Sequence, residues 1–201
     1  SGDGGDELFG GYLTYAASAA HKHLTTVIPS RLRRMLSRAA AWVPQDDHQK
    51  VSGSYKLQRF LRGLELPTAE AHFTWNGTWL PREAAQLIRG DSGTVRSTLR
   101  RLASDHAIPV RPSIHALQCA DLRDYLPNDI LTKVDRMTMA HGVESRAPLL
   151  NPEVADLGLS LPSHLRSHWR HGQKVALRRL CKRHFGAAQQ SAYRLAGKAH
   201  C

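Results

Sequence analysis

The spacing of apolar and polar positions predicts helices along most of the chain. A first helix is expected from Phe9 to about His23, because this stretch is rich in Ala and Tyr and follows a glycine-rich loop. A second is expected from Ser30, a favourable N-cap, to Pro44, which cannot continue a helix. In a third, over 55–66, four apolar residues fall on one face: Leu57, Phe60, Leu61 and Leu64.

Two later segments carry helix start and stop signals. Pro81 has the position typical of the first turn of a helix. The stretch 129–142 follows Pro127 and ends at a glycine, which predicts a helix between them. Its apolar stripe, expected to face a core, consists of Ile130, Val134 and Met137.

Little besides helix is expected in the rest of the chain. The stretch 172–186 predicts one more helix, and the polar residues 45–54 predict a linker. We find no internal repeat and no convincing pair of strands. The visible chain is therefore expected to be almost entirely α-helical.

The charge balance narrows the classes of partner. The 201 residues include 28 Lys and Arg against 17 Asp and Glu, a formal net charge of +11. Such a surplus attracts phosphate-bearing partners. Aromatic residues make up only 6% and no nucleic-acid-binding motif is present, so we do not expect nucleic acid as a partner.

The compartment follows from the cysteines and from the lack of a long apolar run. Three cysteines, Cys119, Cys181 and Cys201, lie far apart and form no CxxC pair, which is typical of reduced thiols in a cytoplasmic protein. No apolar run is long enough to span a bilayer, so no membrane association is expected. A zinc site at His164, His168, His171, Cys181 and His184 is not favoured, because no acid accompanies them and basic residues surround them.

The first twelve residues, "SGDGGDELFGGY", hold the densest candidate chemistry. Free N–H groups at a helix start, with glycines around them, can cradle phosphate, whereas Asp3, Asp6 and Glu7 would repel it. Mg²⁺ resolves this conflict, because it takes carboxylate and phosphate oxygens together. The alternative is an ordinary helix whose first turn carries acidic residues. The stretch has no GK[ST] and is therefore not a Walker A loop.

Several motifs decide between these interpretations. "SGDGGDELFGGY" resembles a signature of the synthetase domain of glutamine-hydrolysing asparagine synthetases, which belong to the ATP-pyrophosphatase superfamily. The resemblance continues in register through "KLQRFLRG", "EAHFTWNG", "DYLPNDILTKVDRMTMAHGVESRAPLLNPEVADLGLSLP" and "GQKVALRRL". It implies an α/β parent domain, with a parallel sheet and surrounding helices, of which this chain holds the helical part.

The resemblance also implies a reaction. Members of the family activate aspartate with ATP and Mg²⁺, which gives β-aspartyl-AMP and pyrophosphate. Ammonia, released from glutamine in a separate N-terminal domain of the same polypeptide, then attacks this intermediate to form asparagine. A homodimer is a further expectation for the whole protein.

The same resemblance assigns roles within the glycine loop. By position, Asp6 corresponds to the Mg²⁺-binding carboxylate, and Asp3 to an acidic residue near the reacting acyl carbon. Ser1, Gly2 and Gly4 would form the loop that lies against the substrate. Glu7 is expected to be a helix-start residue rather than a ligand.

Further candidates lie in the second half of the chain. Lys174 resembles the lysine that neutralises charge on the phosphates as pyrophosphate leaves. The helix that carries Lys133, Asp135 and Arg136 resembles one that borders the nucleotide site.

A short acidic and basic motif follows that helix. Glu144 and Arg146 resemble a Glu-x-Arg-x-Pro motif, expected to be a charge pair at the floor of the site. Asn151 departs from the family, whose members usually have Asp there, and this removes one charge.

Two family features are missing from the printed sequence. We find neither the N-terminal nucleophilic Cys of the glutaminase domain nor an SGGxDS loop. Residues 1–186 are therefore expected to be the C-terminal part of the synthetase domain, followed by a divergent tail over 187–201, and the fragment is expected to be inactive alone. Two alternatives stay open: a related synthetase that joins other amines to other carboxylates, as in β-lactam or peptide-macrocycle formation, and a degenerate binding protein without turnover.

Overall fold

A computed structural model describes residues 1–43, 53–77, 79–168 and 172–184 of the chain. Most of the predicted linker, together with His171 and the tail 187–201, lies outside the described residues. The chain divides into two compact units, which we describe separately. Unit 1 comprises residues 1–13 and 121–201, and unit 2 comprises residues 14–120.

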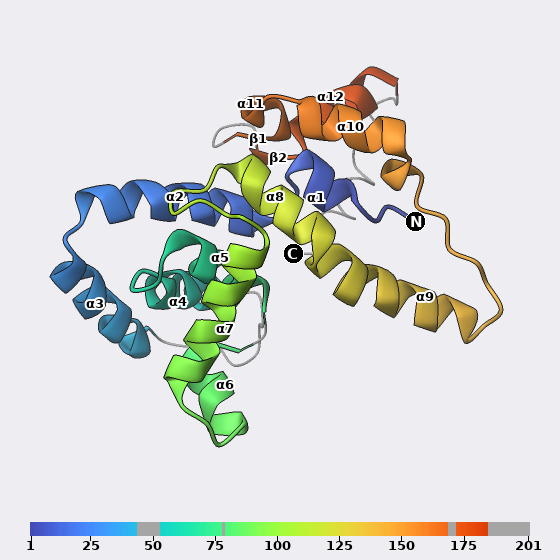
Figure 1. Cartoon of the computed structure of the whole chain (residues 1–201). Coiled ribbons are helices and arrows are strands. Elements are labelled where there is room, and N and C mark those ends of the chain that lie inside the picture. The colour runs from blue at the N-terminus through green and yellow to red at the C-terminus, as the bar shows by residue number, and fades with distance from the viewer. Residues whose placement is uncertain (44–52, 78, 169–171, 185–201) are drawn as a thin grey trace. The chain divides into compact units, whose positions relative to one another are not determined.

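Unit 2 is a cluster of helices. It holds α2 (Leu13–Val27) from residue 14 onward, α3 (Ser30–Ala39), the 3-10 turn η1 (Ala40–Trp42), α4 (Gly53–Gly63), α5 (Thr68–Asn76), α6 (Pro81–Leu87), α7 (Ser92–Asp105) and most of α8 (Ile114–Arg123). Helix α4 packs against α3, η1 and α5, and α7 packs against α5 and α6 (Figure 1). The order of packing therefore runs α3, α4, α5, α7, α6.

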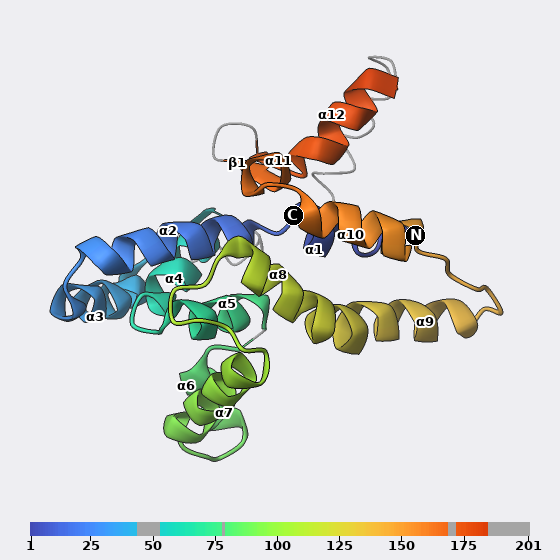
Figure 2. The ribbon, with the colours of Figure 1, turned by 45° about the horizontal axis from the view of Figure 1, so that its top comes forward.

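Unit 1 is built around a very short first helix. It holds α1 (Gly5–Phe9), the end of α8, the π-helical turn η2 (Leu126–Leu131), α9 (Thr132–Met139), the 3-10 turn η3 (Pro148–Leu150), α10 (Pro152–Ser160), α11 (Ser163–Arg166), the strands β1 (Ser167–His168) and β2 (Gly172–Gln173), and α12 (Val175–His184). Helix α1 packs against α10, α11 and α12. Figure 2 shows α9 extending away from this group, with the following segment returning to α10.

The prediction of a mostly helical chain is confirmed. The described residues hold one small departure, an antiparallel pair of two-residue strands, β1 and β2, where no strand pair was expected. Within the described ranges, no helix combines the length and the apolar character needed to cross a lipid bilayer.

The first predicted helix is wrong in its bounds. The expected helix from Phe9 to His23 is instead two helices, because α1 ends at Phe9 and α2 begins at Leu13. Gly10 has φ +69 and donates its N–H to the Asp6 carbonyl, and this left-handed conformation ends the helix.

Two other local predictions are also wrong. Ser30 does not cap α3, because it is the first helical residue and Pro29 precedes it. No residue of α9 is buried. In the predicted stripe, Ile130, which lies in η2, and Val134 are half-buried and Met137 is 67% exposed, so the described structure covers the stripe only in part. By contrast, α6 begins at Pro81 as predicted, and Glu83 accepts a hydrogen bond from the Leu80 N–H at 2.9 Å.

The core of unit 2 contains buried histidines. His21 is fully buried, with its Nε2 3.1 Å from the Gly63 carbonyl and its Nδ1 3.1 Å from the Thr68 hydroxyl. Because a carbonyl only accepts, Nε2 must carry the proton, and Nδ1 accepts from the hydroxyl when the ring is neutral. Burial lowers the pKa of His21, and the positive charge of Arg33 lowers it further. The ring is therefore held in its neutral form.

This burial predicts that acid destabilises the chain through His21. The unfolded chain binds a proton near the ordinary pKa of 6.5, whereas the folded chain resists it, so the free energy of unfolding should fall as pH drops below about 6.5. Denaturant unfolding at pH 7.5 and 5.5 should show a smaller loss in His21→Gln than in the native chain. His23→Gln, at an exposed position of the same helix, is the control and should leave the loss unchanged. An equal loss in all three chains would contradict the prediction.

Candidate functional site

The glycine loop lies directly against the turn η3. Gly4 has φ +83, and a Cβ at this position would overlap the Leu150 side chain. A Cβ on Gly5 would lie 2.9 Å from Cδ1 of Leu149. The loop therefore needs glycine twice, once for backbone conformation and space together and once for space alone.

Helix α1 carries Asp6, and the residue that directly precedes α12 is Lys174; the two side chains meet. The Lys174 ammonium donates to Oδ2 of Asp6 at 2.9 Å, although 168 positions separate the two residues. Their side chains are 34% and 36% exposed, so the pair lies at an accessible surface. A Cβ on Gly11 would overlap both the Asp6 carboxylate and the Lys174 side chain. Gly11 is therefore the residue that makes room for this ion pair.

Lys174 is held in an unusual backbone conformation. Its φ is +51, in the left-handed region that side-chain-bearing residues seldom adopt. It lies between β2 and α12, and its carbonyl accepts from the Arg178 N–H at 2.9 Å, which begins the helix. The surroundings thus fix the lysine where α12 starts, with its ammonium directed at the glycine loop.

Asp3 contributes a buried carboxylate oxygen. Its Oδ2 is inaccessible to solvent and has no hydrogen-bond partner among the described residues. A buried carboxylate oxygen without a donor is costly, and such a group calls for a cation or a donor from a ligand. Asp3 and Asp6 therefore offer two carboxylates of different character within four residues.

Glu7 is more deeply buried than sequence alone suggests. It lies in the first turn of α1, as expected for a helix-start residue, but it is only 1% exposed and its Oε1 accepts from the Tyr12 hydroxyl at 2.7 Å. Burial raises the pKa of Glu7, and the hydrogen bond from Tyr12 opposes this rise. Burial and the nearby Glu7 carboxylate also raise the pKa of Tyr12.

A second tyrosine and a second acid complete this buried group. Tyr12 packs edge-on against Tyr125, with ring centroids 5.9 Å apart, and Asp121 is 1% exposed. Burial and the negative charge of Asp129 raise the pKa of Tyr125. Sequence reasoning did not find Tyr12, Tyr125 or Asp121, and the one signal for Tyr12 was its place at the end of the glycine motif.

The predicted pair of Glu144 and Arg146 is formed. The Arg146 Nε lies 3.0 Å from the Glu144 carboxylate, but the side chains are 84% and 69% exposed. The Arg146 carbonyl accepts from the amino group of Ser1, which links this segment to the glycine loop through the backbone. Asn151, in place of the family's Asp, caps α10 by accepting from the Glu153 N–H at 3.0 Å, so the local hydrogen bond does not need the charge.

The structure does not bring the α9 candidates to the glycine loop. Lys133 pairs with Asp129 at 3.9 Å along the helix, and both side chains are more than half exposed. Asp135 and Arg136 are exposed on the same helix, which extends away from α1 (Figure 2). Gly2, by contrast, lies in the loop with nothing within 4 Å of the position of a Cβ.

The assembled group is thus small and mixed in charge. Asp3, Asp6 and Lys174 lie on or against the glycine loop, whereas Lys133, Asp135 and Arg136 lie apart from it. Among the described residues, no group of three or more His, Cys, Asp or Glu could hold a metal ion. A cation at Asp6 would therefore need oxygen ligands from a bound molecule or from water as well.

Comparison with known proteins agrees with the motifs. Residues 1–188 match the asparagine synthase family. Similar proteins include asparagine synthetase [glutamine-hydrolyzing] 1 of Bacillus subtilis, 30% identical over 173 residues, which are 83% of this chain and 25% of that protein. A putative asparagine synthetase [glutamine-hydrolyzing] of Mycobacterium bovis is 31% identical over 179 residues, 89% of this chain and 26% of that protein.

The chain spans about a quarter of the length of these curated relatives. No solved structure matches the chain. The match over residues 1–188 includes the glycine loop, η3 and Lys174, which are the parts that the structure brings together. The chain therefore belongs to the asparagine synthase family.

Proposed function

We propose that the chain is the C-terminal part of the synthetase domain of a glutamine-hydrolysing asparagine synthetase. In the whole protein this domain would activate aspartate with ATP and Mg²⁺ and then form asparagine from β-aspartyl-AMP and ammonia. The observation that carries the proposal is the 2.9 Å contact between Asp6 and Lys174 on a glycine-lined turn. A carboxylate and an ammonium at one accessible point suit a phosphate chain that arrives with a cation.

The residues present fit a magnesium ion that a nucleotide shares. Mg²⁺ would neutralise phosphate charge in the reaction and is usually bound by one or two carboxylates together with substrate phosphates. Asp6 is exposed enough to contribute one carboxylate oxygen, and the buried Oδ2 of Asp3 has no partner among the described residues. Asp6 would hold the ion, and Asp3 would face the acyl group of the substrate.

Lys174 would neutralise negative charge on the phosphates. In the structure its ammonium donates to Oδ2 of Asp6, and a cation bound by this carboxylate would compete with the ion pair and weaken it. The lysine is then free to follow the oxygens of the departing pyrophosphate, a task that suits a compact charge on a flexible stem. Ser1, Gly2 and Gly4 would line the substrate through their backbone, and Glu144 and Arg146 would brace the segment that meets Ser1.

Other parts of the proposal depend on the rest of the polypeptide. Ammonia would come from glutamine in an N-terminal domain, and the parallel sheet of an α/β parent domain would carry the SGGxDS loop. Lys133, Asp135 and Arg136, exposed on α9, would border the nucleotide only in that larger context. The whole protein would act in the cytoplasm and could form a homodimer. Synthesis of another amide and a binding role without turnover are the alternatives.

The isolated chain should make no asparagine from aspartate, ATP and either nitrogen source. The reason is that Asp6 and Lys174 supply only one side of the proposed nucleotide site. Pyrophosphate release should equal that of Asp6→Ala within error. Any release above this control would show that the described residues suffice.

In a full-length synthetase that contains this chain, Lys174→Ala should slow aspartate-dependent pyrophosphate release more than Lys174→Arg, because Arg keeps the positive charge. Lys174→Gly separates charge from backbone, since glycine adopts φ +51 without strain. This variant should lose as much activity as Lys174→Ala, but it should unfold at a denaturant concentration equal to or higher than that of Lys174→Ala. Equal rates in the native and alanine proteins would contradict the role of Lys174, and a lack of dependence on aspartate would contradict the proposed substrate.

The two loop carboxylates should differ in their dependence on Mg²⁺. In the same full-length protein, Asp6→Asn should lower turnover and raise the Mg²⁺ concentration that gives half-maximal pyrophosphate release. Asp3→Asn should slow turnover with a smaller change in that concentration. Glu7→Gln is the matched control, because its carboxylate is buried against Tyr12 and should leave the Mg²⁺ requirement unchanged. The assignment of Asp6 is wrong if Glu7→Gln gives the largest shift and Asp6→Asn gives none.

A further inference from the structure

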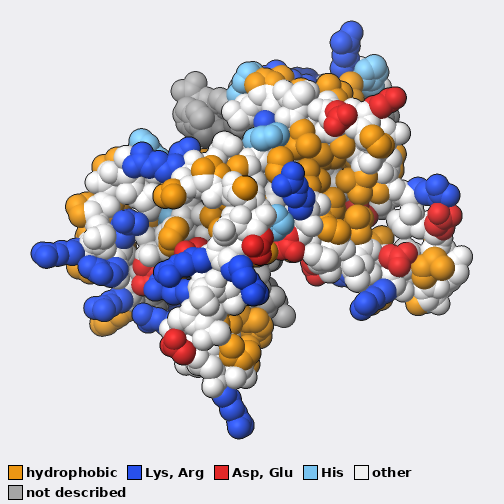
Figure 3. Space-filling model, viewed as in Figure 1, with side chains coloured by type: hydrophobic (Ala, Val, Ile, Leu, Met, Phe, Trp, Pro, Cys, Tyr) orange, Lys and Arg blue, Asp and Glu red, His pale blue; other side chains and the backbone are white. Residues whose placement is uncertain are grey.

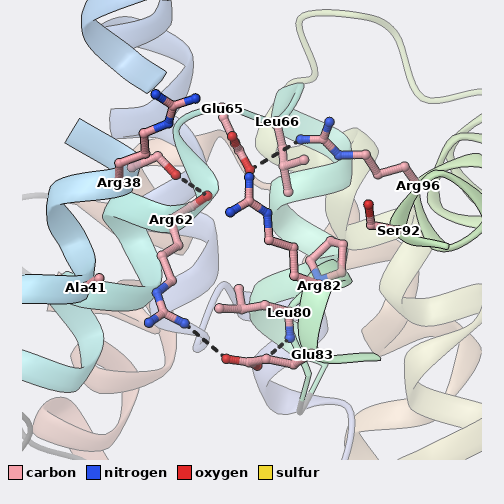
Figure 4. Close-up of a pocket in the computed structure, with 12 residues that line it drawn as sticks. Arg38, Ala41, Arg62, Glu65, Leu66, Leu80, Arg82, Glu83, Ser92 and Arg96 are labelled. Carbon is pink, nitrogen blue, oxygen red and sulfur yellow. Dashed lines mark hydrogen bonds and ion pairs between the residues drawn. The ribbon is translucent and has the colours of Figure 1, made fainter. Parts of the chain in front are cut away.

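Unit 2 contains a cleft that the proposed function does not use. It has a volume of about 400 Å³ and lies between the end of α3, the end of α4, and the first turns of α6 and α7. Its lining residues come from two segments of the chain, 37–41 and 62–96. Figure 4 shows the side chains that surround it.

The charged lining of the cleft is mostly arginine. Four arginines line it, against two glutamates: Arg38, Arg62, Arg82 and Arg96, with Glu65 and Glu83. The glutamates pair with two of the arginines, Arg62 with Glu83 at 3.0 Å and Arg96 with Glu65 at 3.4 Å. The cleft therefore keeps two positive charges that no glutamate of the lining neutralises.

Arg38 and Arg82 supply these two charges. Both are exposed, and neither forms an ion pair with a carboxylate of the described residues. Figure 4 shows the guanidinium groups of Arg38, Arg82 and Arg96 toward one end of the cleft, with the Glu65 carboxylate between Arg82 and Arg96, and the pair of Arg62 and Glu83 toward the other end. One end of the cleft therefore holds three guanidinium groups against one carboxylate.

The base of the cleft is apolar. Leu66 and Leu80 are 3% and 7% exposed, and Pro81 is buried beside them. An apolar base lowers the local dielectric constant and so strengthens the field of the guanidinium groups at the rim. The hydroxyl of Ser92 and that of Ser37 add hydrogen-bonding groups to the lining.

Unit 2 as a whole has the same charge bias. It contains fifteen Lys and Arg against seven Asp and Glu. In Figure 3, Lys and Arg side chains gather over the face formed by α3, α4 and α7. This field would bring anions to the cleft and raise their local concentration there.

We propose that this cleft binds a small phosphorylated anion through Arg38 and Arg82. Guanidinium groups bind phosphate oxygens in pairs, and two unpaired ones at a single opening suit a ligand with at least two negative charges. A carboxylate ligand would meet the same groups, but it carries less charge to offset the two arginines. The site lies wholly within unit 2, so its existence does not depend on the proposed function.

Binding of inorganic pyrophosphate to the whole chain, measured calorimetrically in EDTA, tests this proposal. EDTA removes divalent cations, and with them any binding that Asp6 would support through a metal. The double variant Arg38→Gln, Arg82→Gln should weaken binding by about tenfold or more, the effect of losing one or more charge-assisted hydrogen bonds. Arg101→Gln, an exposed arginine of α7 outside the cleft, is the matched control for net charge and should change binding by less than about twofold.

A variant that is expected to tighten binding makes the test stricter. Glu65→Gln releases Arg96 from its 3.4 Å ion pair and should tighten pyrophosphate binding several-fold. If the pair of Glu65 and Arg96 only held the cleft in shape, Glu65→Gln would weaken pyrophosphate binding instead. Thermal unfolding of each variant confirms that the cleft is intact.

Comparison of AMP with pyrophosphate at equal ionic strength identifies the source of the phosphate. Tighter binding of pyrophosphate assigns the cleft to inorganic polyphosphate, whereas tighter binding of AMP assigns it to a phosphate on an organic body that uses the apolar base. The proposal is overturned if pyrophosphate does not bind, or if the double arginine variant binds as well as the native chain. It is also overturned if single-stranded RNA binds the native and double-variant chains equally and displaces pyrophosphate, since the surplus charge would then act without the cleft.

Discussion

The candidate site depends on the close approach of backbone that Gly11 permits. The Asp6 carboxylate and the Lys174 side chain occupy the space that any Cβ at this position would fill. The 2.9 Å ion pair thus connects residues 168 positions apart only because the chain between α1 and α2 carries no side chain there. Gly4 plays the same part on the other side of α1, where Leu150 fills the space of its missing side chain. Four elements, η3, α10, α11 and α12, therefore pack against this five-residue helix and its first glycines.

That short helix gives two neighbouring carboxylates opposite environments. Successive residues of a helix point about 100° apart, so Asp6 and Glu7 cannot share one surface. Asp6 is 36% exposed and faces an ammonium, whereas Glu7 is 1% exposed and faces a phenol. The pKa of Glu7 is raised by burial, which makes its charged form costly and suits it to holding Tyr12 rather than a cation. These environments give a physical reason for the proposed roles, in which Asp6 binds a cation and Glu7 does not.

Sequence reasoning found what local pattern encodes and missed what packing decides. Asp6 and Lys174 were predicted separately from motifs, and the structure brings them together. The helix start at Pro81 was predictable because proline fixes its own φ and needs no N–H partner. The break at Gly10 was not, because a glycine permits the left-handed conformation without requiring it. The partly covered stripe of η2 and α9 shows the same limit: an apolar face reveals that a helix can pack, but not which partner covers it. The hydrogen bond between Tyr12 and Glu7 depends on the end of α1 at Phe9, and the periodicity of the segment did not predict that end.

The distribution of acidic residues separates two ways of holding phosphate. Unit 1 contains ten Asp and Glu against thirteen Lys and Arg, and three of its carboxylates fall within its first seven residues. Unit 2 has fewer than half as many acidic as basic residues. Carboxylates and phosphates repel, so a loop that presents both Asp3 and Asp6 can accept phosphate only with a cation between them. Guanidinium groups need no cation, and the cleft of Arg38 and Arg82 offers them directly. The two proposed sites therefore respond oppositely to chelation: removal of divalent cations disables the first and leaves the second intact. Charge composition, read unit by unit rather than as a single net value of +11, carries this distinction.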